Sequence, residues 1–198
     1  AFFFQILLNN LYFIGVLTLA TLGLTLTYKT ANITNFAQSI TATTSAFSAA
    51  YLVMKLTLNV WAATIGGVAL AFMIGLIIDA VIIRRANAHG SGRVMITLGL
   101  IILFNAFIPI IFGMIPYEFK RYFSGNLDFS VFGTEFSITK NGLFIFCASF
   151  AVVGIIFAAL NLTKWGLGVR GTASNMSVAS MMGINTNRIT AISWAVSA

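Results

Sequence analysis

The chain is organised around one polar stretch, Gly166-Leu167-Gly168-Val169-Arg170-Gly171-Thr172-Ala173-Ser174-Asn175-Met176-Ser177-Val178-Ala179-Ser180-Met181-Met182-Gly183-Ile184-Asn185-Thr186-Asn187-Arg188. Residues 173–182 contain no glycine or proline, and Thr172 or Ser174 can cap the start of a helix there. Gly183 follows at the position where a left-handed residue usually ends a helix. The stretch therefore predicts a short helix over 172–183, of about three turns, outside the bilayer.

This predicted helix would carry an apolar ridge on one side. At helical spacing Val178, Met181 and Met182 fall together, and methionines adapt to varied partners. Thr186 or Asn187 can cap the next helix, which would begin near Ile189. Composition alone also allows a plain loop between two membrane spans.

The composition of the whole chain is that of an integral membrane protein. Hydrophobic residues make up 59% of it and charged residues 8%, too few for the surface of a soluble domain. The formal net charge of +7 does not indicate nucleic-acid binding, because the basic residues flank apolar segments. The single cysteine, Cys147, lies in an apolar segment, which excludes a disulfide within the chain and a thiolate metal cluster.

Apolar segments long enough to cross a bilayer recur along the chain. A span needs about 20 apolar residues. Five segments meet this length, and a sixth opens near Ile189; the five cover roughly 5–28, 36–56, 61–83, 94–114 and 142–162. We therefore predict an all-α, polytopic transmembrane helical bundle forming a single domain over 1–198. Because the chain lacks an initial Met and stops within a new apolar segment, we expect a fragment whose later spans are missing.

Charge sets the expected orientation. Loops 84–93 and 164–188 hold clustered Lys and Arg and are predicted to be cytoplasmic, which puts the N-terminus outside. Residues 115–141 would also lie outside; they hold all but one of the acidic residues. Alternating runs on both sides of Gly133-Thr134 predict a small hairpin there, and we expect it to face a delivery protein unless it is only an ordered loop.

Polar residues in and beside the second and fourth spans are candidates for a translocation path. Thr34 and a run of polar residues after it share one stripe at helical spacing, and Asn105 lies four residues before Pro109, whose missing N–H frees the Asn105 carbonyl. Such a stripe can line a path or pack helices closely, and both interpretations stay open. The candidate path residues are Asn32, Asn35, Gln38, Thr41, Ser45, Ser48 and Asn105.

The third span combines a small-residue seam with one acid. Small residues recur at steps of four, and this spacing lets another helix approach closely. Asp79 lies near Arg84 and Arg85, so a paired carboxylate is favoured over a proton relay. The seam consists of Ala63, Gly67, Ala71 and Gly75.

The chemistry expected of an enzyme is missing from the sequence. No Gly-x-x-x-x-Gly-Lys-(Ser/Thr) loop occurs, and one histidine cannot form a His-x-x-x-His metal pair or a catalytic set with the few acids. We predict neither catalytic residues, nor a metal site, nor a cofactor.

Three motifs resemble the bacterial ABC permeases for branched-chain amino acids, the LivH type. They are Asn32-Ile33-Thr34-Asn35-Phe36-Ala37-Gln38, which departs from the family pattern at Ser39, Arg93-Val94-Met95-Ile96-Thr97-Leu98-Gly99-Leu100, and the spaced pattern from Arg170 to Arg188. The resemblance implies that 172–183 is a coupling helix docking into an ATP-binding subunit. The residues implied to couple are Arg170, Ala173, Asn175, Ala179, Met182, Gly183, Ile184 and Asn185.

The resemblance implies a multi-pass permease subunit of the bacterial cytoplasmic membrane. Its implied partners are two ATP-binding cassette subunits that hydrolyse ATP, a second permease subunit and an extracytoplasmic substrate-binding protein. The cargo would be branched-chain or similar amino acids. Sugar and nucleoside permeases share the small-x-Gly-Ile-Asn end of the last motif, so a permease of the same superfamily for urea, amides, nucleosides or sugars is an alternative. A passive channel, an ion-coupled carrier or a membrane scaffold are alternatives from other classes.

Overall fold

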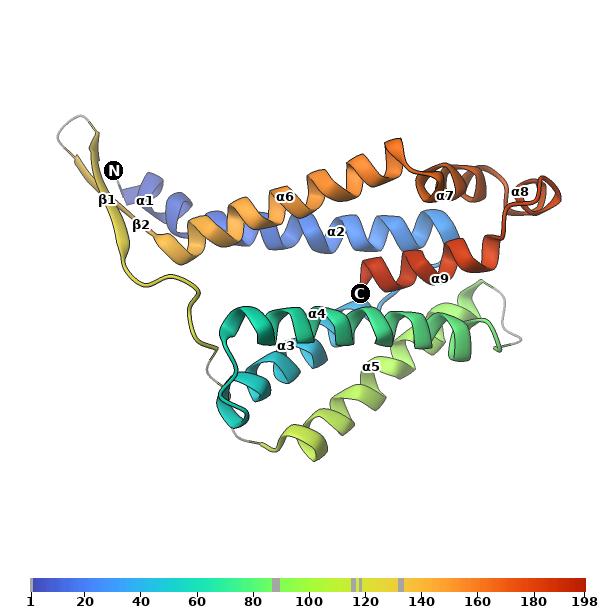
Figure 1. Ribbon diagram of the computed structural model, residues 1–198, viewed down its shortest axis with the longest axis horizontal. Helices are drawn as coiled ribbons and strands as arrows, with labels where there is room; N and C mark the ends of the chain where they lie inside the picture. Colours follow the sequence, from blue (N-terminus) through green and yellow to red (C-terminus); the bar gives the residue numbers. More distant parts are fainter. Residues whose placement is uncertain (1, 87–89, 115–116, 118, 132–133) are drawn as a thin grey trace. The chain divides into compact units, whose positions relative to one another are not determined.

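The computed structural model describes residues 2–86, 90–114, 117, 119–131 and 134–198 (Figure 1). The chain forms two compact units. The first unit contains Ala1–Leu22 and Arg121–Ala158, and the second contains Gly23–Lys120 and Ala159–Ala198. The single domain over 1–198 stays a prediction.

The first unit joins a β-hairpin to helical segments. Strand β1 (Asn126–Val131) pairs antiparallel with β2 (Thr134–Thr139), so the predicted hairpin is present, although Gly133 lies outside the described residues. Helix α1 (Phe2–Asn9) is tied to β2 through the Gln5 amide, which donates to the Ser137 carbonyl at 2.6 Å and accepts from the Ser137 N–H at 3.2 Å. The unit also contains parts of α2 (Leu11–Ala31) and α6 (Lys140–Leu162).

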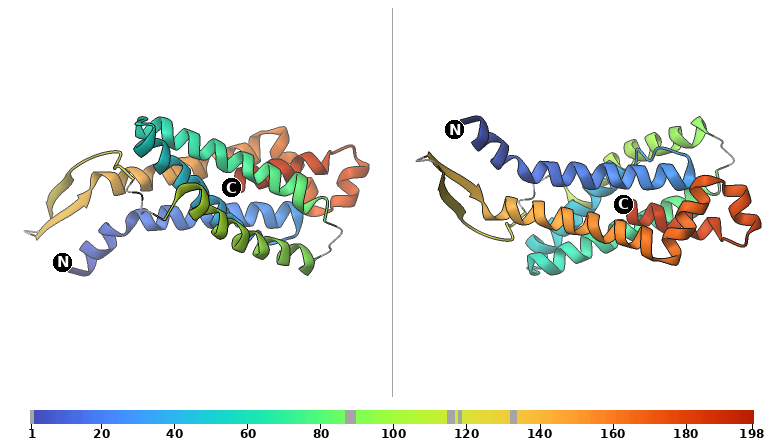
Figure 2. Two further views of the ribbon diagram at one scale, coloured as in Figure 1. Left: turned by 90° about the horizontal axis from the view of Figure 1, so that it is seen from below. Right: turned by 90° about the horizontal axis from the view of Figure 1, so that it is seen from above.

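Among the described residues of the second unit, all regular secondary structure is helical. It holds the rest of α2 and of α6, together with α3 (Gln38–Lys55), α4 (Val60–Ile77), the π-helix η1 (Ile78–Ile83), α5 (Ser91–Phe112), α7 (Lys164–Ser174), α8 (Met176–Met181) and α9 (Thr186–Ser197). Figure 2 shows α7, α8 and the start of α9 at the same end of this unit as η1 and the start of α5.

Four helical segments are long and apolar enough to cross a membrane: Leu11–Ala31, Val60–Ile83, Ser91–Phe112 and Lys140–Leu162. They match four predicted spans, and the all-α polytopic fold class is confirmed. The expected span over 36–56 does form helix α3, but α3 is not among the four. Its first half is rich in serine and threonine, which lowers its hydropathy. Helix α9 has 12 residues and is followed by Ala198, the last residue of the sequence.

The predicted small-residue seam of α4 packs against two helices. Its four members, Ala63, Gly67, Ala71 and Gly75, are all buried. A Cβ at Gly67 would lie 2.9 Å from the Ser45 carbonyl oxygen of α3. A Cβ at Gly75 would lie 2.7 Å from the Trp194 carbonyl oxygen of α9. The seam therefore brings two backbones against α4, as expected for small residues at this spacing.

The core of the second unit surrounds α9. The Trp194 side chain is fully buried, in one cluster with Ile33, Ile40, Ile78 and Ile83. Helix α9, which begins at the end of the polar stretch 166–188, therefore packs in the same core as residues of the span-length helices.

Candidate functional site

The link between α2 and α3 has a non-helical backbone beside the core. Asn32 has a φ of 53° and its N–H donates to the Tyr28 carbonyl, which ends α2 with a left-handed residue. The Asn32 side chain is exposed, whereas Asn35 is only 3% exposed. Among the described residues, the buried Asn35 Oδ1 has no hydrogen-bond partner. An amide acceptor left open in this way can receive a hydrogen bond from a transient ligand or a water molecule.

Gln38 is the point where three helices of the second unit meet. The Ser197 hydroxyl of α9 donates to Gln38 Oε1 at 3.3 Å. A Cβ at Gly23 of α2 would lie 2.5 Å from Gln38 Nε2 and 3.0 Å from the Ser197 carbonyl oxygen. The absence of a side chain at Gly23 is therefore what admits the polar contact between α3 and α9.

The remaining candidate path residues differ in how deeply they are buried. Thr41 is 1% exposed, and its hydroxyl donates to the Ala37 carbonyl of its own helix. Ser45 and Ser48 are half-buried, and the Ser45 hydroxyl donates to the Ala42 carbonyl. Asn105 is exposed on α5 and does not join the buried group, while α5 continues through Pro109 to Phe112. The structure thus gathers Asn35, Gln38 and Thr41, and a path-lining role for any of them stays a prediction.

The second unit also buries hydroxyls that sequence analysis did not single out. Most of them donate to a carbonyl three or four residues earlier in their own helix, which satisfies the hydroxyl within the helix and lets it be buried. The available signal was a threonine or serine within an apolar or small-residue helix. They are Thr27, Thr30, Thr44, Thr97, Thr190, Ser193 and Ser197.

The predicted pairing of Asp79 is confirmed. Arg84 approaches Asp79 Oδ2 at 2.6 Å, and the same guanidinium nitrogen donates to the Asn187 carbonyl at 2.7 Å. The Asp79 side chain is 6% exposed and that of Arg84 39% exposed. Asp79 also accepts the Arg84 N–H through its backbone carbonyl, a bond over five residues that is typical of the π-helix. Arg84 therefore ties the end of η1 to the start of α9.

Helix α7 begins earlier than the predicted helix. The Thr163 hydroxyl accepts from the Gly166 N–H at 3.1 Å and caps α7, so the predicted N-caps at Thr172 and Ser174 are wrong. Thr172 is buried inside α7, and Ser174 is its last residue. At Gly166 a Cβ would overlap the Leu160 carbonyl, so only glycine allows this sharp turn after α6.

Helix α8 is separated from α7 at Asn175. The Asn175 side chain accepts from the N–H groups of Ser177 and Val178, at 3.0 and 3.1 Å, and is the true N-cap. The predicted continuous helix over 172–183 is therefore two helices. Asn175 favours a break between α7 and α8 because its side-chain oxygen can accept hydrogen bonds from the first N–H groups of α8.

The end of α8 follows the prediction. Gly183 has a φ of 84° and its N–H donates to the Ser180 carbonyl, while the Ile184 N–H donates to the Ala179 carbonyl. These two bonds form a Schellman motif. The next N-cap is Asn185, whose side chain accepts from the Arg188 N–H at 3.1 Å, so the predicted caps at Thr186 and Asn187 are wrong.

The predicted apolar ridge faces away from the protein. Val178 is 49% exposed, Met181 85% and Met182 78%, whereas Ala179, on another side of α8, is 3% exposed. We call these three exposed side chains the α8 ridge. Among the other coupling candidates, Ala173 is exposed and Ile184 is half-buried, and Arg170 donates to Asn161 Oδ1 at 3.2 Å.

Two glycines of α7 allow close packing against the residues that follow the α8 ridge. A Cβ at Gly168 would lie 2.6 Å from Ile189 Cδ1, and a Cβ at Gly171 would lie 3.1 Å from Ile184 Cδ1. Helix α7 therefore packs closely against the start of α9 and against the segment that joins α8 to α9. A rigid, capped helix end with exposed methionines is suited to docking a partner surface.

Comparison with known proteins gives one family. The family model described as the permease component of a branched-chain amino acid transport system matches residues 6–198. A curated relative from Methanocaldococcus jannaschii, described as a probable branched-chain amino acid transport permease protein LivH, is 29% identical over 203 residues. That alignment covers 98% of this chain and 62% of the relative, so the chain spans less than two thirds of the relative's length. No solved structure matches.

Proposed function

The chain belongs to the family of branched-chain amino acid transport permease components, and we propose that it acts in the membrane-spanning subunit of an ATP-driven importer. It is a multi-pass protein of the cytoplasmic membrane, in agreement with its span-length helices. The proposed cargo is a branched-chain or similar amino acid, the class in the name of the archaeal relative. ATP hydrolysis would take place on separate ATP-binding cassette subunits.

The α8 ridge is the observation that carries this proposal. A transport subunit without its own nucleotide site needs a surface through which an ATPase can act on it. The ridge exposes Val178, Met181 and Met182 on a helix that is capped at both ends. Large apolar side chains that protrude singly from a rigid element are typical anchors of protein interfaces. We assign the ridge to the ATP-binding subunit.

Movement of α8 would reach the membrane helices through α9. The Schellman turn at Gly183 and the Asn185 cap join the two helices through the four residues 182–185. Helix α9 then packs on Gly75 of α4 and contacts Gln38 of α3 through Ser197. Because packed helices shift as bodies rather than deform, a displacement at the ridge would be passed to the α3–α4 contact.

The proposed path includes the polar residues around Gln38. Asn35 has an open buried acceptor, and Gln38 bonds to Ser197 across two helices. A shift of α9 would alter this Gln38–Ser197 contact and expose polar groups to an amino acid in transit. Two further partners are proposed from the family: a second permease subunit and an extracytoplasmic substrate-binding protein.

Substitution on the ridge tests the proposal. The test uses the complete transporter, reconstituted with its ATP-binding subunit. The double variant Met181→Glu, Met182→Glu should weaken binding of that subunit by roughly tenfold or more, because it replaces two apolar interface side chains with charged ones. Substrate-stimulated ATP hydrolysis and uptake into proteoliposomes should fall with it. Both side chains are exposed, so membrane insertion should be unchanged.

Ser180→Glu is the matched control. Ser180 is exposed on the same helix but lies away from the ridge, and its hydroxyl donates only to the nearby Ser177 carbonyl. This variant adds a charge to α8 and should keep coupling within about twofold of the wild-type value. Equal coupling in the Met181→Glu, Met182→Glu double variant and the wild type would contradict the proposed role of the ridge. Uptake by the chain in ATP-depleted vesicles would favour a passive channel instead.

A further inference from the structure

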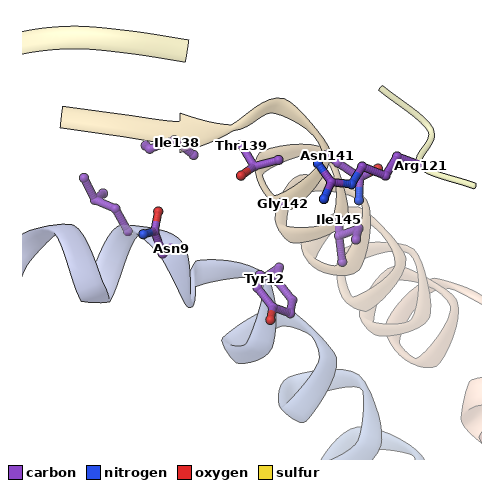
Figure 3. A pocket seen from close by; sticks show the side chains of 9 residues that line it. Asn9, Tyr12, Arg121, Ile138, Thr139, Asn141, Gly142 and Ile145 are labelled. Carbon is purple, nitrogen blue, oxygen red and sulfur yellow. The ribbon is translucent and has the colours of Figure 1, made fainter. Parts of the chain in front are cut away.

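A cavity of about 180 Å³ lies in the first unit, far along the chain from the α8 ridge. It is bordered by the start of α2, the end of β2 and the first turns of α6 (Figure 3). Apolar side chains form part of its wall, and the Tyr12 ring lies close to Gly142, where a Cβ would be 3.7 Å from Tyr12 Cδ1. Because α2 and α6 are both long and apolar enough to cross a membrane, we expect their first turns near one membrane surface.

The described polar side chains that line the cavity are one guanidinium and several uncharged groups that can donate hydrogen bonds, and they include no carboxylate. Figure 3 shows Arg121 extending from its loop towards the first turn of α6, where Asn141 also lines the cavity. The Asn141 Oδ1 accepts from the Tyr122 N–H at 3.0 Å, which orients the amide and leaves its NH₂ group to donate. Asn9 and Thr139 complete the polar lining. Among the described residues, no acidic side chain lines the cavity or pairs with Arg121.

We propose that this cavity binds the phosphate of an anionic phospholipid headgroup through Arg121 and Asn141. A guanidinium matches the geometry of phosphate oxygens and forms charge-assisted hydrogen bonds to them. The cavity is smaller than the roughly 300–1,000 Å³ of sites for drug-sized ligands, so it suits a headgroup whose acyl chains stay outside. On the cytoplasmic side of membranes, basic pockets between helices bind such headgroups, and Arg121 offers the same chemistry at the outer surface predicted for residues 115–141.

The surroundings distinguish a lipid from a free amino acid. A zwitterionic amino acid also carries an ammonium group, and among the described residues the lining offers no carboxylate to neutralise that charge beside the Arg121 guanidinium. A lipid needs an apolar surface beside the phosphate. Leu8, Ile138 and Ile145 provide it at the cavity, and Phe13 and Leu17 are exposed further along α2. Phosphatidylglycerol therefore fits the site better than the proposed cargo.

Native mass spectrometry of the purified full chain in detergent tests this assignment. A short-chain phosphatidylglycerol should bind, and diacylglycerol with the same acyl chains should not, because it lacks the phosphate. Arg121→Gln should weaken phosphatidylglycerol binding by about tenfold, the loss expected for a charge-assisted hydrogen bond. Arg121→Lys, which keeps the charge but not the planar fork, should bind with intermediate affinity.

Asn141→Asp is a second variant that should fold normally. The aspartate can still accept from the Tyr122 N–H, but it brings a negative charge to the phosphate and should weaken binding by at least about tenfold. Lys120→Gln is the matched control, because it removes the neighbouring positive charge from a residue that does not line the cavity. Its affinity should stay within about twofold of the wild type.

Three results would overturn the proposal. Equal losses in Arg121→Gln and Lys120→Gln would indicate general attraction to the basic loop rather than a site. Diacylglycerol binding as tightly as phosphatidylglycerol would show that the phosphate is not recognised. The third result is that phosphatidylglycerol does not bind, whereas inorganic phosphate or leucine binds and loses affinity in Arg121→Gln. That result would assign the cavity to a free small molecule. None of these results depends on the ATP-driven import proposed for the α8 ridge.

Discussion

At Gly75 a single missing side chain decides how α4 and α9 pack. A Cβ there would meet the Trp194 carbonyl oxygen at 2.7 Å and Ala195 Cα at 2.8 Å, and these backbone atoms cannot rotate away. Gly75→Ala should therefore lower the free energy of unfolding by about 1–3 kcal/mol, as overpacking does. Gly99→Ala is the control, because a Cβ there meets nothing within 4 Å; it should be neutral or stabilise α5 by up to about 1 kcal/mol. Thermal unfolding in one detergent compares both, and equal melting temperatures would refute the packing argument.

The Asp79–Arg84 pair gives a second prediction at the residue scale. Asp79 is buried, and Arg84→Gln would leave its carboxylate without the charged partner at 2.6 Å. Since Arg84 is partly exposed, solvent screening reduces the expected loss to about 2–3 kcal/mol. Adding Asp79→Asn should recover most of that loss by removing the buried charge. Denaturation of the single and double variants, with exposed Arg85→Gln as control, would measure this coupling, and additive losses would contradict it.

At the scale of elements, α8 depends on its caps because it has only six residues. Asn175→Ala removes the acceptor for two N–H groups and should cost about 1 kcal/mol, enough to fray so short a helix. Asn175→Asp should keep the cap. Hydrogen exchange should therefore speed up over 176–181 in the alanine variant alone, with loss of substrate-stimulated ATP hydrolysis in the reconstituted transporter. Unchanged exchange in Asn175→Ala would show that packing, rather than capping, holds α8.

The same helix shows what local sequence can and cannot predict. Gly183 was identifiable because few other residues adopt its φ of 84° at a helix end. Asn175 was missed because an asparagine within a run free of glycine and proline is compatible with a continuous helix or with a cap. The choice depends on distant packing, such as Gly168 against Ile189, which no local pattern contains.

At the scale of the whole molecule, hydropathy predicted four spans because membrane helices must be apolar along their length. It also predicted α3 as a span, although the hydroxyls of Thr41 and Thr44 make that helix less apolar while bonding within it. Contacts between segments that are far apart in the sequence could not be predicted from hydropathy. The Gln38–Ser197 and Arg84–Asn187 hydrogen bonds and the cavity at Arg121 arise only after the helices have packed.

Membrane topology supplies the last prediction. The bond from Arg84 to the Asn187 carbonyl holds two positively charged loops together, so both should be cytoplasmic by the positive-inside rule. Helix α6 is long enough to cross once, which would put the β-hairpin on the outer side.

Cysteine labelling tests this topology in a Cys147→Ala background, which removes the exposed native cysteine. Arg85→Cys and Met182→Cys should resist a membrane-impermeant maleimide in intact cells and react with it in inside-out vesicles. Asp128→Cys, on the exposed face of β1, should show the opposite pattern. If Met182→Cys reacted in intact cells, the α8 ridge would face away from every ATP-binding subunit, and its proposed role would fail while the family assignment stood.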